Sequence, residues 1–259
     1  MQTSIIDTHT HLDHLENADE ALARASHCGV QSVLSVGVDL AANRKNIELK
    51  HRIQSPRIYI GLGIHPGDIK TDEIEETIRF IEQNIHEASC VGEIGLDFWY
   101  KWVRKDDAKK DEQREVYRRL LNVAKMHGLP VVIHSRGAWK YCLEILKEVG
   151  VKQGVFHWYS GPLDILDQVL DYGFYVGCTP SISTSPEARQ AMAHAPIERT
   201  LIETDTPVYY RHIDQEGGFK AEPKDVFKTL EYYAQIKKMD PLQAVSILNK
   251  NAIELFGLS

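Results

Sequence analysis

The sequence predicts an α/β protein in which eight parallel strands alternate with helices and close into a single (β/α)8 barrel. Eight short apolar runs alternate with longer amphipathic stretches, and no Pro/Ser-rich linker or low-complexity segment divides the 259 residues. This length suits one barrel, so we expect residues 1–259 to form one domain. A doubly wound open sheet is the alternative, but no glycine-rich phosphate-binding sequence follows the first predicted strand.

The predicted strands are short and rich in β-branched residues, which favour an extended backbone. Strands that alternate with helices form right-handed βαβ units, and such strands lie parallel in one sheet. In chain order, the expected strands are Ser4–Thr8, Ser32–Val36, Ile58–Ile64, Cys90–Ile94, Pro130–His134, Gly154–His157, Phe174–Gly177 and Thr200–Glu203.

The predicted helices lie between and after these strands, in stretches where apolar and polar residues alternate at helical spacing. The acidic residues 72–76 favour a helix start, because carboxylates interact well with the positive end of the helix dipole. In chain order, the expected helices are Ala18–Ser26, Leu40–Ile53, Asp72–His86, Glu112–His127, Trp139–Val149, Leu163–Tyr172, Pro186–His194, Pro223–Lys237 and Pro241–Phe256.

The composition excludes several classes of protein. With 30 Lys and Arg against 37 Asp and Glu, the net charge of −7 excludes an extensive electrostatic grip on nucleic acid but allows a local basic patch. No apolar run approaches the roughly 18 residues of a membrane span, and the first residues leave no room for a secretory signal. The four cysteines lie far apart, which is typical of a reducing compartment. We therefore expect a cytoplasmic protein with no membrane association and no obligate protein partner.

Ionisable side chains stand near the carboxyl ends of five predicted strands. In the first, His9 and His11 are two residues apart, so both imidazoles lie on one face of an extended segment and can share a cation. In a barrel these strand ends meet at one mouth, and buried charges there need a partner or a metal. The sequence therefore predicts a metal site at the mouth. Its expected ligands are His9, His11, Glu93, His134, His157 and Asp205.

Four imidazoles and two carboxylates exceed what one tetrahedral zinc ion needs. They suit two divalent metal ions about 3.5–4 Å apart. Glu93 is the expected bridge, because its two oxygens can bind separate ions. Mixed nitrogen and oxygen ligands suit Zn, Mn, Co, Ni or Fe, and Mg less well, so the identity of the metal stays open.

Six segments along the chain carry a family resemblance. They are Asp7–Asp13, Gly92–Phe98, Leu129–Arg136, Gly154–His157, Glu203–Pro207 and Asn251–Phe256. With these motifs the chain resembles the TatD family of metal-dependent deoxyribonucleases, within the amidohydrolase-type TIM barrel superfamily. The resemblance covers essentially the whole length. It implies that the six residues above are the metal ligands, and that the activity is hydrolysis of phosphodiester bonds in DNA.

The sequence departs from the family pattern at one position. Gly67 stands where many members have a second histidine after the proline, although His65 is retained as an expected substrate contact. The departure keeps open a small-molecule hydrolase acting on a phosphoester, lactone or amide. Glu93, in place of a lysine that could be carbamylated, argues against the amide-cleaving members. A non-catalytic binding protein is a third hypothesis, which the intact set of ligands disfavours.

The expected chemistry is attack by a metal-activated water, with Glu93 and Asp205 as the catalytic carboxylates. Asp205 is predicted to take the proton of the water and to pass one to the leaving oxygen. Arg136 can place its guanidinium on a phosphate, because that group forms paired hydrogen bonds with phosphate oxygens.

The loop after the fourth strand is predicted to bind DNA that is single-stranded or end-frayed. Over Trp99–Lys110, five basic residues against two acidic ones give a local charge of +3. Aromatic side chains interleaved with cations are typical of single-strand binding, since bases stack while cations meet phosphates. The segment Tyr209–His212 is expected to add to the same rim. The predicted contacts in the loop are Trp99, Lys101, Trp102 and Arg104.

Overall fold

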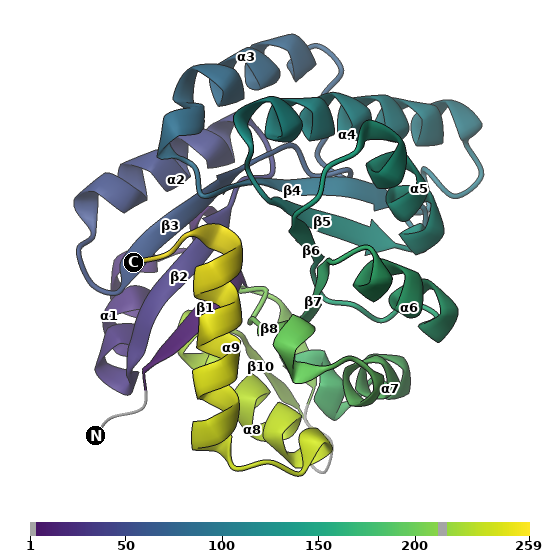
Figure 1. The fold of residues 1–259 in the computed structure, drawn as a ribbon. Coiled ribbons are helices and arrows are strands. Elements are labelled where there is room, and N and C mark those ends of the chain that lie inside the picture. Colours follow the sequence, from purple (N-terminus) through teal and green to yellow (C-terminus); the bar gives the residue numbers. More distant parts are fainter. Residues whose placement is uncertain (1–3, 212–216) are drawn as a thin grey trace.

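The predicted barrel is present. The structure is a computed structural model that describes residues 4–211 and 217–259, so His212 of the predicted rim segment lies outside the described residues. Eight parallel strands are hydrogen-bonded in chain order and form a near-closed barrel (Figure 1). The strands are β1 (Ile5–Thr10), β2 (Val30–Val36), β3 (Arg57–Leu62), β4 (Cys90–Asp97), β5 (Val131–Arg136), β6 (Gly154–Phe156), β7 (Tyr175–Cys178) and β8 (Thr200–Ile202).

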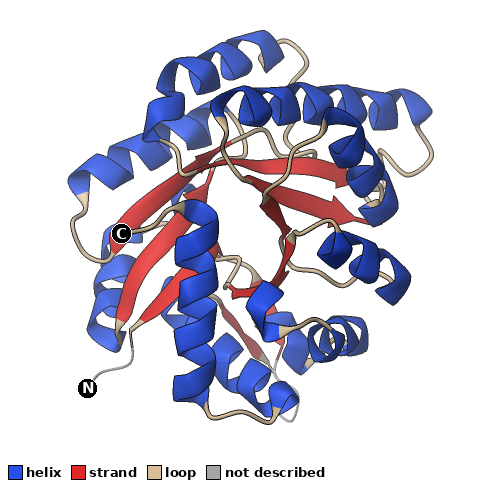
Figure 2. Ribbon diagram, viewed as in Figure 1, coloured by secondary structure: helices blue, strands red, loops and turns tan. Residues whose placement is uncertain are grey.

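Helices surround the strands, as Figure 2 shows with blue helices outside red strands. Within the described residues, none is both long enough and apolar enough to cross a membrane. Every predicted helix is present, and three of them match the expected bounds at both ends. The helices are α1 (Ala18–Cys28), α2 (Leu40–Arg52), α3 (Ile74–Asn84), α4 (Asp107–His127), α5 (Trp139–Val149), α6 (Leu163–Asp171), α7 (Pro186–His194), α8 (Val226–Lys237) and α9 (Pro241–Phe256).

Several helices begin at a residue whose side chain caps the first turn. The carboxylate of Asp39 accepts the backbone N–H of Ala42 at 2.9 Å, which satisfies one of the free donors at the start of α2. Asp240 does the same for α9, where Pro241 occupies the first helical position. Local chemistry of this kind is why the predicted bounds of α9 are correct.

An apolar floor lies inside the barrel. Ile6, Leu34, Val132, Val155 and Leu201, each from a different strand, belong to one buried cluster. Residues after the middle of α9 complete this cluster; they are Ala252, Leu255, Phe256 and Leu258. Because side chains alternate along a strand, the residue two positions further along points the same way and lies above this floor. Polar side chains that follow the floor residues are therefore aimed into the mouth.

The barrel closes where the segment after β8 meets β1. The backbone N–H of Asp205 donates to the carbonyl of His9 at 3.0 Å, and the N–H of His11 donates to the carbonyl of Thr206 at 2.8 Å. In Figure 1, α9 lies beside β1 and β8, and its contacts with both strands cover this closure from outside. The closure brings residues from the two ends of the barrel sequence side by side.

Some predicted bounds are wrong. Strand β4 extends to Asp97, beyond the expected Ile94, because its last residues pair with β5 up to Arg136. The glycines in this run obscured the strand, and pairing with a neighbour overrides their low strand propensity. Helix α4 begins at Asp107, five residues before the expected Glu112, because Asp106 caps it by accepting the N–H of Lys109.

A short antiparallel hairpin was also not predicted. It pairs β9 (Tyr209–Arg211) with β10 (Gly218–Lys220), directly after the segment that carries Asp205. Three-residue strands carry too little alternation to be recognised in a sequence. The hairpin belongs to the mouth of the barrel, because it follows β8.

Candidate metal centre

The six predicted residues converge at the mouth around the carboxylate of Glu93. Its Oε1 lies 2.8 Å from His134 Nδ1 and 2.8 Å from His157 Nε2. Its Oε2 lies 3.4 Å from His9 Nε2 and 3.3 Å from His11 Nε2. Each oxygen therefore faces its own pair of imidazoles, an arrangement that suits a bridging carboxylate.

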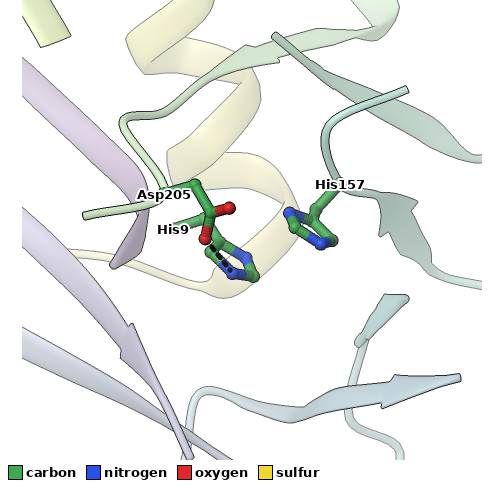
Figure 3. Close-up of side chains that lie close together, drawn as sticks. All are labelled: His9, His157 and Asp205. Atoms are coloured by element: carbon green, nitrogen blue, oxygen red, sulfur yellow. Dashed lines mark ion pairs between the residues drawn. The ribbon is translucent and has the colours of Figure 1, made fainter. Parts of the chain in front are cut away.

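Asp205 lies beside the pair of imidazoles formed by His9 and His11. Its Oδ1 is 3.4 Å from His9 Nε2 and 3.2 Å from His11 Nε2. Figure 3 shows Asp205 and His157 on either side of His9, whose ring stacks on that of His157 with centroids 3.9 Å apart. Asp205 has a φ of 51°, which is uncommon outside glycine, and its bond to the His9 carbonyl holds it there. The backbone thus fixes the direction of this carboxylate.

A second layer of carboxylates orients the imidazoles. His134 Nε2 lies 2.9 Å from Asp97 Oδ2, and His157 Nδ1 lies 3.4 Å from Glu203 Oε1. The hydrogen bond to Asp97 orients the His134 ring so that its other nitrogen faces inward, whereas Glu203 acts on the His157 ring through its charge. Asp97 and Glu203 were not predicted as site residues, although both stand in strand-end motifs of the sequence.

Asp7 supports the centre from below. Its carboxylate accepts hydrogen bonds from the Thr204 backbone N–H at 3.0 Å and from the Thr204 hydroxyl at 2.6 Å. Burial raises the pKa of Asp7 well above its usual value, against the effect of these hydrogen bonds. The contacts hold the residue before Asp205, so Asp7 helps to position that side chain.

The inner carboxylates remain ionised despite their burial. Burial opposes the charged form of Asp205, but its interaction with His11 and the charge of His9 lower its pKa to about 2. Burial likewise opposes ionisation of Glu93, and the surrounding histidines hold its pKa well below the usual value. In the same way, these carboxylates overcome desolvation at His11 and raise its pKa to about 10. Protonated histidine thus balances the ionised carboxylates of the centre, a positive charge that a bound cation could supply instead.

One orphaned atom shows that the cage fits a metal ion. Oε2 of Glu93 is buried and has no hydrogen-bond partner among the described residues. A buried, ionised oxygen without a partner costs several kcal/mol, and a cation would remove that cost. Among residues 4–211 and 217–259, three groups of side chains have ligand atoms within 4.8 Å of one another. The groups are His9, His157 and Asp205; His9, His11 and Glu93; and His65, Glu93 and His134.

The third of these groups places His65 closer to the centre than predicted. Its ring meets that of His134 edge-on with centroids 4.5 Å apart, and its Nδ1 lies 2.7 Å from Asp68 Oδ2. The sequence predicted a substrate contact at this position. The geometry lets His65 serve either a substrate or a cation.

A cavity of about 390 Å³ opens above the centre. Of the predicted substrate contacts, His65, Trp99 and Arg136 line it. Lys101, Trp102 and Arg104 are not among the described residues of its wall. Aromatic side chains that the sequence analysis did not single out complete the wall; they are Tyr100, Trp139 and Trp158.

Arg136 is partly engaged before any substrate arrives. Its Nε donates to Asp97 Oδ2 at 2.7 Å, and its guanidinium lies 4.8 Å from the centre of the Tyr100 ring. Only the terminal nitrogens are left for a substrate. The pairing with Asp97 also joins Arg136 to the carboxylate that orients His134.

The predicted basic loop is shorter than expected. Lys109 and Lys110 lie in the first turn of α4, where they form ion pairs with Glu112 and Asp107. Because these two cations belong to a capped helix and are balanced by ion pairs, they do not add to a free basic patch. The cations that remain exposed in the loop are Lys101, Arg104 and Lys105.

Comparison with known proteins agrees with this geometry. Residues 6–257 match a protein family described as TatD related DNase. The chain belongs to the TatD family. It is therefore a metal-dependent hydrolase, and the predicted family is confirmed.

Individual TatD relatives cover almost the whole chain. An uncharacterized metal-dependent hydrolase, YabD of Bacillus subtilis, is 31% identical, covering 98% of this chain and 100% of its own length. Deoxyribonuclease TATDN3 of Homo sapiens is 25% identical, over 97% of this chain and 94% of its own. The solved structure of YJJV, a TatD homolog from Escherichia coli, superposes with a TM-score of 0.88 at 25% identity, with both chains fully covered.

Tyr100 accounts for the departure from the TatD pattern at Gly67. A Cβ atom on Gly67 would lie 2.8–2.9 Å from the Tyr100 ring and hydroxyl, which is closer than van der Waals contact allows. The ring stacks on Trp102 with centroids 4.3 Å apart, and the Arg136 guanidinium also lies against it, 4.8 Å from its centre. In this chain a tyrosine from the loop after β4 thus takes the space of a side chain at position 67.

We expect Glu93→Gln to abolish metal binding, because a neutral amide lacks the negative charge with which a carboxylate bridges two cations. Metal content of reconstituted, dialysed protein is expected to fall from two divalent ions per chain to nearly none. The exposed Glu16→Gln is the matched control and is expected to keep both ions. One ion or fewer in the saturated wild-type protein would contradict the dinuclear centre.

We expect Gly67→Ala to lower the free energy of unfolding by about 1–2 kcal/mol, because the added methyl group displaces the Tyr100 ring. In a Tyr100→Ala background the same change is expected to cost nothing. Urea denaturation of the four proteins of this double-mutant cycle measures the coupling. An equal cost in both backgrounds would show that the two positions do not compete for space.

Proposed function

We propose that this chain is a deoxyribonuclease of TatD type that hydrolyses phosphodiester bonds in single-stranded or end-frayed DNA. The observation that carries the proposal is the Glu93 carboxylate, each oxygen of which faces a pair of histidines, with Asp205 alongside. Such a double cage supports two cations, and two cations suit displacement at a phosphodiester. The human relative named Deoxyribonuclease TATDN3 supports the same substrate class.

The proposed ligands of two divalent ions are the six converging residues. Divalent ions in this cage would stabilise negative charge on phosphoryl oxygens and make water more acidic. His134 and His157 are oriented for the task by the outer carboxylates Asp97 and Glu203. The four free cysteines, Cys28, Cys90, Cys142 and Cys178, support a reducing location and hence the cytoplasm.

Asp205 is the proposed proton carrier. It is ionised near neutral pH, and its fixed backbone aims the carboxylate into the cavity that would hold the scissile bond. There it would accept the proton of the attacking water and pass one to the leaving oxygen. Arg136 would bind a non-bridging phosphate oxygen through its terminal nitrogens, since Nε is held by Asp97.

The rim is proposed to hold the DNA strand. Trp99 is 58% exposed and meets Trp139 edge-on, which leaves its ring available for stacking on a base. Lys101, Arg104 and Lys105 are exposed and take part in no ion pair within residues 4–211 and 217–259, so their charges are free to meet phosphates. Base stacking and phosphate pairing together favour a single strand.

A small-molecule hydrolase on the same centre is the second candidate. The cavity of about 390 Å³ is of the size that encloses a small ligand, and Tyr100 narrows it beside position 67. A phosphoester, lactone or amide would then be the substrate. A small ligand enclosed in this cavity would leave the exposed Trp99 ring without a function. We therefore favour DNA as the substrate.

A substrate panel separates the two candidates. We expect the metal-loaded protein to prefer a single-stranded oligonucleotide over a phosphomonoester, a lactone and an amide. Asp205→Asn is expected to lower kcat on DNA by ~10²–10⁴-fold with little change in KM, because it removes the proton carrier. The exposed Asp171→Asn is the control with unchanged kinetics. A lactone or amide as the best substrate, with DNA left intact, would overturn the proposal.

Neutralising the rim tests the DNA contacts directly. In the triple variant Lys101→Ala, Arg104→Ala, Lys105→Ala, the slope of log affinity against log salt is expected to fall by about 0.7 for each lost phosphate contact. Trp99→Ala is expected to lose ~1–3 kcal/mol of binding at every salt concentration, because stacking is not electrostatic. Both proteins should hydrolyse a small chromogenic phosphodiester normally.

The control for charge is a triple alanine variant at Arg79, Lys238 and Lys250, which lie on or next to α3, α8 and α9. It removes the same formal charge away from the rim. Equal salt slopes for the wild-type protein and the rim variant would show that the loop does not contact DNA.

A further inference from the structure

A second hollow of about 560 Å³ adjoins the mouth of the barrel. It is built from the loops after β6, β7 and β8, and Trp158 lines both this hollow and the cavity above the metal centre. The loops after the seventh and eighth strands are the place where barrels of this kind frequently bind phosphate. The hollow therefore lies one side chain away from the centre, on the same face.

The wall of this hollow carries positive charge in a protein whose net charge is −7. Arg189 and Arg211 both line it, together with the hydroxyl groups of Ser181 and Ser183, and no carboxylate is among the described residues of the wall. Arginine and hydroxyl side chains are the usual partners of phosphate oxygens. The composition of the wall selects an anion.

Arg189 is held in place without losing its charge. Its Nε donates to the Ile182 carbonyl at 3.1 Å, and its Nη2 donates to the Ser183 carbonyl at 2.5 Å. Carbonyl acceptors fix the guanidinium but do not neutralise it, so its remaining N–H groups stay available. Arg211 is exposed and forms no ion pair within the described part of the chain.

The hairpin strand β9 presents an aromatic ring beside these cations. Tyr209 and Arg211 are exposed, whereas Tyr210 between them is buried and donates its hydroxyl to the Thr204 carbonyl at 2.9 Å. This alternation puts Tyr209 and Arg211 on one face of β9. The hydrogen bond of Tyr210 connects this strand to the residue before Asp205, and so links the hollow to the centre.

We propose that this hollow is a nucleotide subsite, which binds the nucleotide next to the one that is cleaved. Arg189 and Arg211 bind its phosphate, and the 58% exposed ring of Tyr209 stacks on its base. The DNA strand then runs from the metal centre over Trp158 into the hollow. The assignment rests on the proposed deoxyribonuclease function and adds to it a defined second binding position.

A length series of single-stranded oligonucleotides, from two to six residues, tests the subsite. The wild-type kcat/KM is expected to rise at least tenfold when the added nucleotide reaches the hollow, and Arg189→Ala/Arg211→Ala is expected to lose that rise. Part of this rise in kcat/KM should disappear when the wild-type enzyme is given a substrate with an abasic residue at the position that reaches the hollow. Tyr209→Ala should lose that same part with the normal substrate. All variants should hydrolyse bis(p-nitrophenyl) phosphate at the wild-type rate.

Arg44→Ala/Arg79→Ala, on α2 and α3, is the control and should retain the full dependence on length. An unchanged length dependence in Arg189→Ala/Arg211→Ala would overturn the subsite while leaving the deoxyribonuclease function intact. If the wild-type protein cleaves no DNA, that function fails, and fluorescence anisotropy of a labelled hexanucleotide still tests the subsite. Equal affinity of the wild-type and Arg189→Ala/Arg211→Ala proteins would then overturn it.

Discussion

The structure of the mouth depends on a single buried charge, the Glu93 carboxylate. An ionised carboxylate away from water is stable only where other groups replace its hydration, and here imidazoles from β5, the end of β6 and the end of β1 surround it. Those imidazoles need orientation in turn, which the outer carboxylates supply. The apolar floor below lowers the local dielectric constant, which strengthens each of these interactions.

In this barrel the strands carry the residues of the charged cage, and the loops carry residues of the outer cavity. The charged cage is built on β1, β4, β5 and the segments that follow β6 and β8, where backbone hydrogen bonds fix each side chain. The groups that line the outer cavity, among them Trp99, Tyr100 and Trp158, come from loops. Loop residues can therefore differ without a change in the metal centre. Tyr100 is an example, because it takes the space beside Gly67 while the cage below is complete.

Features that depend on local spacing were predictable from the sequence. The alternation of strands and helices gave the barrel, and strand-end positions gave the six converging residues, because both follow from backbone geometry. Features that depend on approach in space were not. Asp97 gains its role because β5 brings His134 beside it, and Tyr100 matters because the loop folds back over Gly67. The early start of α4 was readable, since Asp106 is an ordinary helix cap, but the basic residues around it suggested a loop.

The position of Glu93 within β4 sets how far a substrate must reach. Four more residues follow it before the strand ends at Asp97, a length of about 13 Å along a strand that is tilted to the barrel axis. Glu93 therefore lies at the bottom of a well, below the rim that Trp99 and Arg136 mark. A polymer can bring a phosphate down to it only by extending a thin, flexible end. If the substrate is the proposed DNA, the depth of the centre favours chain ends over the middle of a stiff duplex.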